Sequence, residues 1–198
     1  MQRGKTMLDG RQNADVVQQA ASLRRQLCYT ESSPVVIVTV ARQVLSLELA
    51  GKIVAAYPVS TAANGIGGRD GSGRTPPGLH RIAAKIGADA PGGTVFKGRQ
   101  PTGEVVSISN VSSPAPTQDL ITSRILRLAG LEPGVNQGEG CDSYARYIYI
   151  HGTADELRLG QPVSHGCVRM ANADVMALFD AVEVGTPVFI TTALQQAS

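Results

Sequence analysis

The sequence lacks the features that mark several classes of protein. Its formal net charge is only +2, from 18 basic and 16 acidic residues, and no dense cluster of lysine or arginine is present. This balance argues against a nucleic-acid partner or an anionic membrane surface. Apolar runs such as residues 53–57 are far shorter than the ~20 residues of a transmembrane helix. We therefore expect no nucleic-acid partner and no membrane span.

Cysteine and histidine are scarce, with three of each. Three cysteines without framework spacing do not predict a disulfide-stabilised fold, and they fit a reducing compartment. Cys28 and Cys141 are expected to be small buried hydrophobic residues. Residues 1–27 carry mixed charges and lack the apolar stretch of a secretion signal. We therefore expect a cytoplasmic protein, or a periplasmic one if a leader is missing from this chain.

The elements that the sequence does predict are mostly short strands. Hydrophobic residues make up 42% of the 198 residues, which is enough for the core of one compact domain. β-Branched and apolar runs predict strands over residues 35–40, 44–49, 53–59, 79–86, 105–109, 147–150 and 187–192. Helical spacing predicts helices over 13–27 and 119–129, and a third that Asn172 caps and Gly185 stops. This pattern favours a mainly β fold with a few helices.

One short segment, residues 164–170, gathers the groups needed for cysteine acyl transfer. Cys167 would attack a carbonyl as its thiolate, and a thiolate at neutral pH needs a neighbouring imidazole or cation. His151 is expected to supply that imidazole from the end of the strand over residues 147–150, and so to keep the thiol ionised. Gly152 is expected to turn the chain sharply after it.

The neighbours of Cys167 fit the same chemistry. Gly166 removes a Cβ where a substrate carbonyl must approach, leaving the amides of Gly166 and Cys167 to hold an oxyanion. Arg169 shares a face with Cys167 if this segment is extended, and its cation suits a substrate carboxylate. The segment therefore predicts a nucleophile with an anion-binding surround.

Other interpretations of the same residues are weaker. A zinc ion could take four ligands from this sequence, namely His151, His165, Cys167 and Cys141. Their spacing matches no common zinc motif. We therefore predict no metal and no cofactor. The glycine-rich residues 65–74 lack the ending of a phosphate-binding loop and are interpreted as a mobile loop near the cleft. His80 is expected to be a wall or core residue rather than a catalytic one.

The segment 164–170, together with His151-Gly152-Thr153, closely resembles the signature of the L,D-transpeptidase catalytic domain, a family that processes peptidoglycan stem peptides. The resemblance extends through residues 57–61 and 75–82 and covers about 34 to 192. It implies a β-sandwich-like catalytic domain over 34–198, preceded by a helical extension over 1–33. It also implies specific roles: Cys167 as nucleophile, His151 as general base, the Gly152 carbonyl as the group that orients the imidazole, and Ser164, His165, Gly166 and Arg169 as other members of the site.

The resemblance also implies a substrate. Because no secretion signal is visible, we expect an L,D-carboxypeptidase that removes the terminal D-alanine from peptidoglycan tetrapeptides or muropeptides during murein recycling. An L,D-transpeptidase that crosslinks peptidoglycan through the same thioester is the alternative. A non-catalytic muropeptide-binding module is a further one. Carbapenem acylation of Cys167 is expected from the family.

Overall fold

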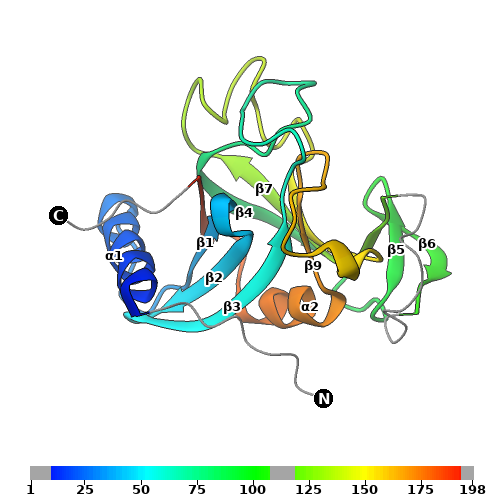
Figure 1. Ribbon diagram of the computed structural model, residues 1–198, viewed down its shortest axis with the longest axis horizontal. Coiled ribbons are helices and arrows are strands. Elements are labelled where there is room, and N and C mark those ends of the chain that lie inside the picture. Colours follow the sequence, from blue (N-terminus) through cyan, green and yellow to red (C-terminus); the bar gives the residue numbers. More distant parts are fainter. Residues whose placement is uncertain (1–9, 108–118, 193–198) are drawn as a thin grey trace.

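A computed structural model describes residues 10–107 and 119–192 (Figure 1). Its α-helices are α1 (Gly10–Leu27) and α2 (Asn172–Ala181). Its strands are β1 (Val35–Thr39), β2 (Val44–Leu49), β3 (Lys52–Ser60), β4 (Gly78–Ile86), β5 (Thr94–Lys97), β6 (Gln100–Val105), β7 (Ile121–Gly130), β8 (Tyr149–Thr153), β9 (Val168–Met170) and β10 (Pro187–Thr191). The protein is therefore mainly β with few helices, as its sequence predicts.

The strands close on themselves. They follow the order β4-β10-β1-β2-β3-β9-β8-β7, and β7 pairs back with β4. The hairpin of β5 and β6 branches from β7 and projects to the side opposite α1 (Figure 1). Two neighbouring pairs are parallel, β1 with β10 and β8 with β9. The second of these brings the segment after Cys167 alongside the strand that carries His151.

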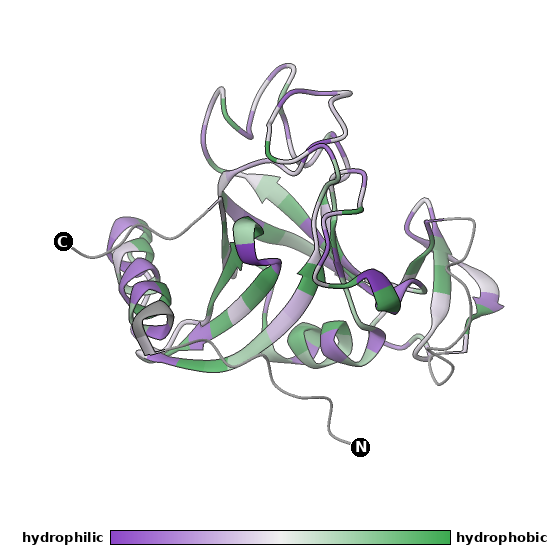
Figure 2. Cartoon of the chain, viewed as in Figure 1, coloured by the Kyte–Doolittle hydropathy of each residue, from purple (hydrophilic) through white to green (hydrophobic). Residues whose placement is uncertain are grey.

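Two of the three hydrophobic clusters meet at β1, which is buried on both faces, while the third gathers Phe96, Ile125 and Tyr149 with Cys167 packed against it. Val36 and Val38 belong to the inner cluster, which α2 completes with Leu178 and neighbouring residues. Val35 and Ile37 belong to a second cluster under α1, whose Val16, Ala20 and Leu23 lie against the outer face. Figure 2 shows the mixed hydrophilic and hydrophobic surface of α1 that a helix with one buried face requires.

An ion pair fixes α1 to this sheet. The Arg24 Nη2 lies 2.5 Å from Glu48 Oε2, and both side chains are buried. Arg24 also donates to the Ser33 carbonyl through Nε at 2.9 Å, while Glu48 Oε1 accepts the Gly51 amide at 2.6 Å. Helix α1 is thus held by a buried charge pair as well as by apolar packing.

The helix predicted over residues 119–129 is wrong. That stretch forms β7, which pairs with β4, β5 and β8. Five consecutive residues, Thr122 to Leu126, are buried, so the strand does not show the alternation that normally reveals strands. A bulge between Thr122 and Ile125 disturbs the pattern further.

The strand predicted over 105–109 is also misplaced. The chain instead forms the hairpin of β5 and β6, which ends at Val105, and residues 108–109 lie outside the described part of the chain. Two smaller differences concern the ends of α2. Its cap is Ala171, with Asn172 as the first helical residue, and it ends at Ala181, before Gly185.

The two cysteines outside the motif are not the buried hydrophobic residues that we expected. Cys28 is exposed, and Cys141 is only partly buried, with its Sγ 3.4 Å from the Gln137 carbonyl. Polar and turn-forming neighbours place both in loops. In the residues that the structure covers, no helix is long and apolar enough to cross a membrane.

Candidate active site

His151 lies in the middle of β8, not at its end as expected. The parallel pairing with β9 continues past it, so His151 lies opposite Arg169 and Gly152 opposite Met170. The imidazole is buried, and its Nδ1 lies 2.8 Å from the Gly152 carbonyl. Because a carbonyl only accepts, Nδ1 carries the proton and Nε2 keeps the free lone pair. The ring is thus fixed in the tautomer of a general base.

Gly152 has a different role from the sharp turn predicted for it. It continues β8, and a Cβ at this position would lie 2.6 Å from the Thr122 carbonyl oxygen and 2.8 Å from Asn172 Oδ1. The glycine therefore permits the close approach of β7 and α2 behind the histidine. The same Asn172 oxygen accepts hydrogen bonds from Thr122 and Ser123, which ties β7 to α2.

Cys167 immediately precedes β9 and contacts the backbone of the segment leading into β8. Its Sγ accepts the Tyr149 amide at 3.4 Å and donates to the Tyr147 carbonyl at 3.5 Å. Among the described residues, no hydrogen bond joins Sγ to the ring of His151, although Tyr149 is only two positions before that histidine. The structure brings the predicted nucleophile to the strand of the predicted base without a direct hydrogen bond.

Burial controls the protonation of both groups. It raises the pKa of the Cys167 thiol to about 11, and the charge of Asp119 adds to this, while the Tyr149 amide and Arg169 oppose it. Burial also lowers the pKa of the His151 imidazole. Both shifts favour a neutral thiol and a neutral imidazole over the thiolate that we expected, which stays a prediction.

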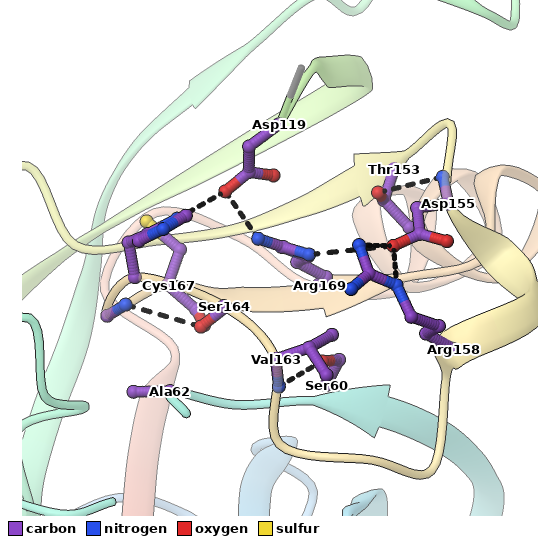
Figure 3. A network of polar contacts seen from close by, with 12 residues as sticks. Ser60, Ala62, Asp119, Thr153, Asp155, Arg158, Val163, Ser164, Cys167 and Arg169 are labelled. Atoms are coloured by element: carbon purple, nitrogen blue, oxygen red, sulfur yellow. Dashed lines mark hydrogen bonds and ion pairs between the residues drawn. The ribbon is translucent and has the colours of Figure 1, made fainter. Parts of the chain in front are cut away.

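Ser164 shapes the loop that presents the thiol. Its Oγ donates to the Cys167 carbonyl at 2.6 Å and accepts the Gly166 amide at 3.2 Å (Figure 3). We had expected the Gly166 amide to be free to hold an oxyanion. It is instead already engaged by Ser164. Gly166 itself has φ of 138°, and a Cβ there would lie 3.3 Å from Ile148 Cδ1. Glycine is needed here for the path of the backbone.

Arg169 is paired within the chain. Its side chain is only 3% exposed; Nη2 donates to Asp119 Oδ2, and Nη1 lies 3.9 Å from Asp155 Oδ2. The same Asp119 oxygen accepts His165 Nδ1 at 3.0 Å, and Asp155 accepts Arg158 Nε at 2.5 Å (Figure 3). The guanidinium that we expected to meet a substrate carboxylate thus meets two carboxylates of this chain instead.

Two residues of this region, Asp119 and Arg146, were not predicted. Arg146 donates to the carbonyls of Gly67, Gly68 and Arg74. Asp119 came just before a strand taken for a helix, and Arg146 lies in a loop, so no local periodicity marked either one. Their partners are distant in sequence and become visible only in the fold.

The glycine-rich loop lies next to the cysteine loop, as expected, but it is not free of contacts. Thr75 Oγ1 donates to the Gly166 carbonyl at 3.0 Å, and Arg146 holds the loop from the other side. The loop lines an open pocket of about 610 Å³, formed by Gly67, Gly68, Arg69, Asp70, Gly71, Ser72 and Arg74. The residues that line this pocket are candidates for one wall of the substrate cleft.

The remaining expectations concern His80 and metal. His80 is buried, with Nδ1 donating to the Gly78 carbonyl at 3.0 Å and Nε2 2.9 Å from Ser143 Oγ, so it is a core residue as predicted. Within residues 10–107 and 119–192, no group of three or more histidine, cysteine, aspartate or glutamate side chains is arranged to hold a metal ion.

A comparison with protein families agrees with the motif and the fold. The YkuD model, described as the L,D-transpeptidase catalytic domain, matches residues 33–190. The chain belongs to this L,D-transpeptidase family. The match covers β1 to β9, most of β10 and both motif segments, so the resemblance seen in the sequence is confirmed.

Named relatives are similar to this L,D-transpeptidase-family chain over a short stretch. The "Probable L,D-transpeptidase YbiS" of Escherichia coli is 51% identical over 49 residues, which are 23% of this chain and 16% of that protein. The "Putative L,D-transpeptidase YqjB" of Bacillus subtilis is 52% identical over 46 residues, 23% of this chain and 26% of that protein. The matched segments thus span well under two thirds of either relative.

A solved structure shows the same fold. An L,D-transpeptidase from Mycobacterium smegmatis is 17% identical, with a TM-score of 0.50. The match covers 82% of this chain and 60% of that protein's chain. L,D-transpeptidase 3 from Mycobacterium tuberculosis, in complex with a faropenem-derived adduct, is also 17% identical, with coverages of 80% and 60% and a TM-score of 0.49.

Proposed function

We propose that this L,D-transpeptidase-family protein forms a thioester between Cys167 and a peptidoglycan tetrapeptide stem, with release of the terminal D-alanine. The observation that supports this most is the position of Cys167: its Sγ lies against the backbone of Tyr149, on the strand that presents His151 with Nε2 as acceptor. A nucleophile just before β9 and a base on the adjacent strand β8 are the two groups that such an acyl transfer requires.

The neutral state of the pair determines how the first step proceeds. Sγ attacks the carbonyl carbon of the third stem residue while its proton passes to Nε2 of His151. The attack forms the C–S bond and leaves the negative charge on the carbonyl oxygen as an oxyanion. The thiol and the imidazole share no hydrogen bond in the free protein, so substrate binding must bring them together. The Cys167 amide is the oxyanion donor in this proposal, because Ser164 engages the Gly166 amide.

The intermediate then collapses to the thioester. The C–N bond to D-alanine breaks, and the imidazolium of His151 returns its proton to the leaving amine. Water or an amine next attacks the thioester, with His151 again accepting the proton, and Cys167 leaves as the thiol. The atoms balance in both cases, and the acceptor alone decides the product.

We propose hydrolysis as the main second step, which makes the protein an L,D-carboxypeptidase acting in murein recycling. Transpeptidation is the second candidate, and it is favoured by the names of the similar proteins, which are L,D-transpeptidases. A cytoplasmic location is part of the first proposal, because tripeptide recycling takes place where no assembled wall is available as acceptor. Cell fractionation of the native host tests that location.

A product analysis tests both functions and the rival binding module. The protein is incubated with a disaccharide tetrapeptide, with and without a second stem peptide as amine acceptor, and the products are followed by mass spectrometry. Tripeptide and free D-alanine in both samples support the carboxypeptidase. A peptide dimer that appears only with acceptor supports the transpeptidase instead. Binding without any product, at a range of pH values, would leave only the binding module.

A further inference from the structure

Two arginines and two tyrosines stack beside the nucleophile. The Cζ of Arg99 lies 5.1 Å from the centroid of the Tyr147 ring, and the Cζ of Arg127 lies 5.3 Å from the same centroid. Arg127 also stacks on Tyr144, with its Cζ 3.3 Å from that ring. Both rings are exposed. We call Arg99, Arg127, Tyr144 and Tyr147 the Arg–Tyr cluster.

Two members of this cluster have an unfavourable backbone conformation. Arg99 has φ of 70° and Tyr147 has φ of 57°, a region that favours glycine. Arg99 lies in the two-residue turn between β5 and β6, where Lys97 pairs with Gln100. Gly98 also has a positive φ, 58°, and positive φ at both central residues is typical of the tight turns that join two hairpin strands. This turn carries Arg99, whose guanidinium lies over the ring of Tyr147.

The Arg–Tyr cluster adjoins Cys167 through its member Tyr147 and through the nearby Tyr149. The Tyr147 carbonyl accepts the Cys167 thiol, and the Tyr149 amide donates to its Sγ. At the other end of Tyr149, the hydroxyl accepts Arg99 Nη1 at 3.2 Å. The length of one tyrosine side chain therefore separates the guanidinium of Arg99 from the sulfur.

Arg99 differs from the other cations near the site. Arg169 is neutralised by Asp119 and Asp155, and Arg146 is engaged by backbone carbonyls. Arg127 donates to the Tyr144 carbonyl at 2.8 Å, and its charge acts on Asp142. Arg99 makes no ion pair with any residue in the described ranges, and its side-chain hydrogen bond goes to the neutral hydroxyl of Tyr149. A guanidinium that lies over an aromatic ring without a carboxylate of its own suits a planar anion from outside.

We propose that the Arg–Tyr cluster binds a carboxylate at the end of the third residue's side chain in the acyl-donor peptide, and so selects the donor. This inference rests on the proposed function. The third residue supplies the carbonyl that Sγ attacks, and a long side chain beginning next to that carbonyl can span the distance set by Tyr149. The carboxylate of the departing D-alanine is only two bonds from the scissile nitrogen, too close to the sulfur to reach Arg99.

The test uses two tetrapeptides that end in D-alanine and differ at one group. Their third residue is 2,6-diaminopimelate, with its distal carboxyl free in one peptide and amidated in the other. D-Alanine release is measured for the unaltered protein, for Arg99→Gln, and for Lys97→Gln. The last variant is a matched control, because Lys97 is an exposed cation on the same hairpin. Binding of both peptides to Cys167→Ala is measured by calorimetry.

The unaltered protein and Lys97→Gln are expected to prefer the free carboxyl by about tenfold in kcat/KM, as for one charge-assisted hydrogen bond. Arg99→Gln is expected to lose this preference through a higher KM for the free acid, with the amidated peptide little changed. Equal use of both peptides by the unaltered protein would overturn the proposal, and so would an equal loss on both in Arg99→Gln. If Cys167→Ala prefers the free acid but the unaltered protein releases no D-alanine, the cluster's role stands and the proposed reaction fails.

Discussion

The carboxylate of Asp119 lies against the guanidinium of Arg169, two residues beyond the nucleophile. We had expected Arg169 to bind a carboxylate of the substrate. It is instead paired with a carboxylate of the chain itself. Asp119 also raises the pKa of the Cys167 thiol, whereas Arg169 lowers it. The pair therefore balances the charge around the sulfur, and it favours the protonated thiol in the free protein.

Asp119→Asn is expected to lower the pKa of the Cys167 thiol, because it removes the negative charge and leaves Arg169 uncompensated. The measurement is the rate of iodoacetamide alkylation against pH, in a background of Cys28→Ser and Cys141→Ser so that one thiol remains. The exposed Asp89→Asn is the control and should leave the profile unchanged. An unchanged or higher pKa in Asp119→Asn would show that the pair does not control the thiol.

The same assay on the unaltered pair tests the resting protonation state. With the thiol pKa at about 11, alkylation should rise about tenfold per pH unit between pH 7 and 10, as the thiolate fraction does. A preformed thiolate–imidazolium pair would instead give fast alkylation that is flat across neutral pH. That result would contradict the neutral pair on which the proposed first step depends.

Arg24→Ala is expected to destabilise the protein by about 3–5 kcal/mol, because it leaves the buried carboxylate of Glu48 without its partner. Urea unfolding followed by circular dichroism measures the change in free energy. Arg25→Ala, the exposed neighbour on the same helix, should cost less than about 0.5 kcal/mol. Replacing the pair together, as Arg24→Met with Glu48→Leu, should recover most of the loss; failure to recover it would mean that Arg24 acts through Ser33 instead.

His80 makes stability depend on pH. Burial lowers its pKa from 6.5 to about 4, so the unfolded chain binds a proton more readily than the folded one. The stabilisation is complete above pH 6.5 and is lost as the pH falls toward 4, by about 3 kcal/mol for such a shift. Protonation of Nε2 would also break the hydrogen bond from Ser143.

Urea unfolding at several pH values from 7.5 to 4.5 measures this loss in the unaltered protein and in His80→Gln. Burial lowers the pKa of His151 as well, so both proteins should lose some stability in acid. The unaltered protein should lose more than the variant. Parallel losses would assign the acid sensitivity to other groups.

Carbapenem acylation of Cys167 is a separate expectation from the family. Incubation with imipenem should add the mass of one drug molecule to the intact protein, on the peptide that contains Cys167. The addition should be absent from Cys167→Ser and present in Cys28→Ser. Labelling of Cys28 or Cys141 instead would show that exposure of the thiol, and not the site, determines the reaction.

The sequence predicted the consecutive strands β4, β10, β1, β2 and β3 of the ring better than β7 and the hairpin that branches from it. Strands β1 to β4 and β10 were identified because they are short β-branched runs bounded by turns. Strand β7 was taken for a helix because it is buried on both faces and pairs with three strands, which removes any alternation. The hairpin of β5 and β6 was missed because β6 is exposed throughout and polar.

The site shows the same limit. The motif placed Cys167 and Ser164 together because they are neighbours in sequence, and it gave the Gly152 carbonyl as the partner of His151. It could not give Asp119, Arg146 or Arg99, since these come from the segment just before β7, a loop and a hairpin that only the closed ring brings together. Protonation was also out of reach, because the pKa values depend on burial.

The central claim is that Cys167 carries the acyl group, and intact-protein mass spectrometry tests it most directly. The protein is mixed with a tetrapeptide, quenched in acid within seconds, and weighed, while free D-alanine is measured in the same samples. We predict a tripeptidyl adduct on Cys167 that disappears at later times as product accumulates, with neither adduct nor D-alanine in Cys167→Ala. Release of D-alanine at an unchanged rate by Cys167→Ala would contradict the account.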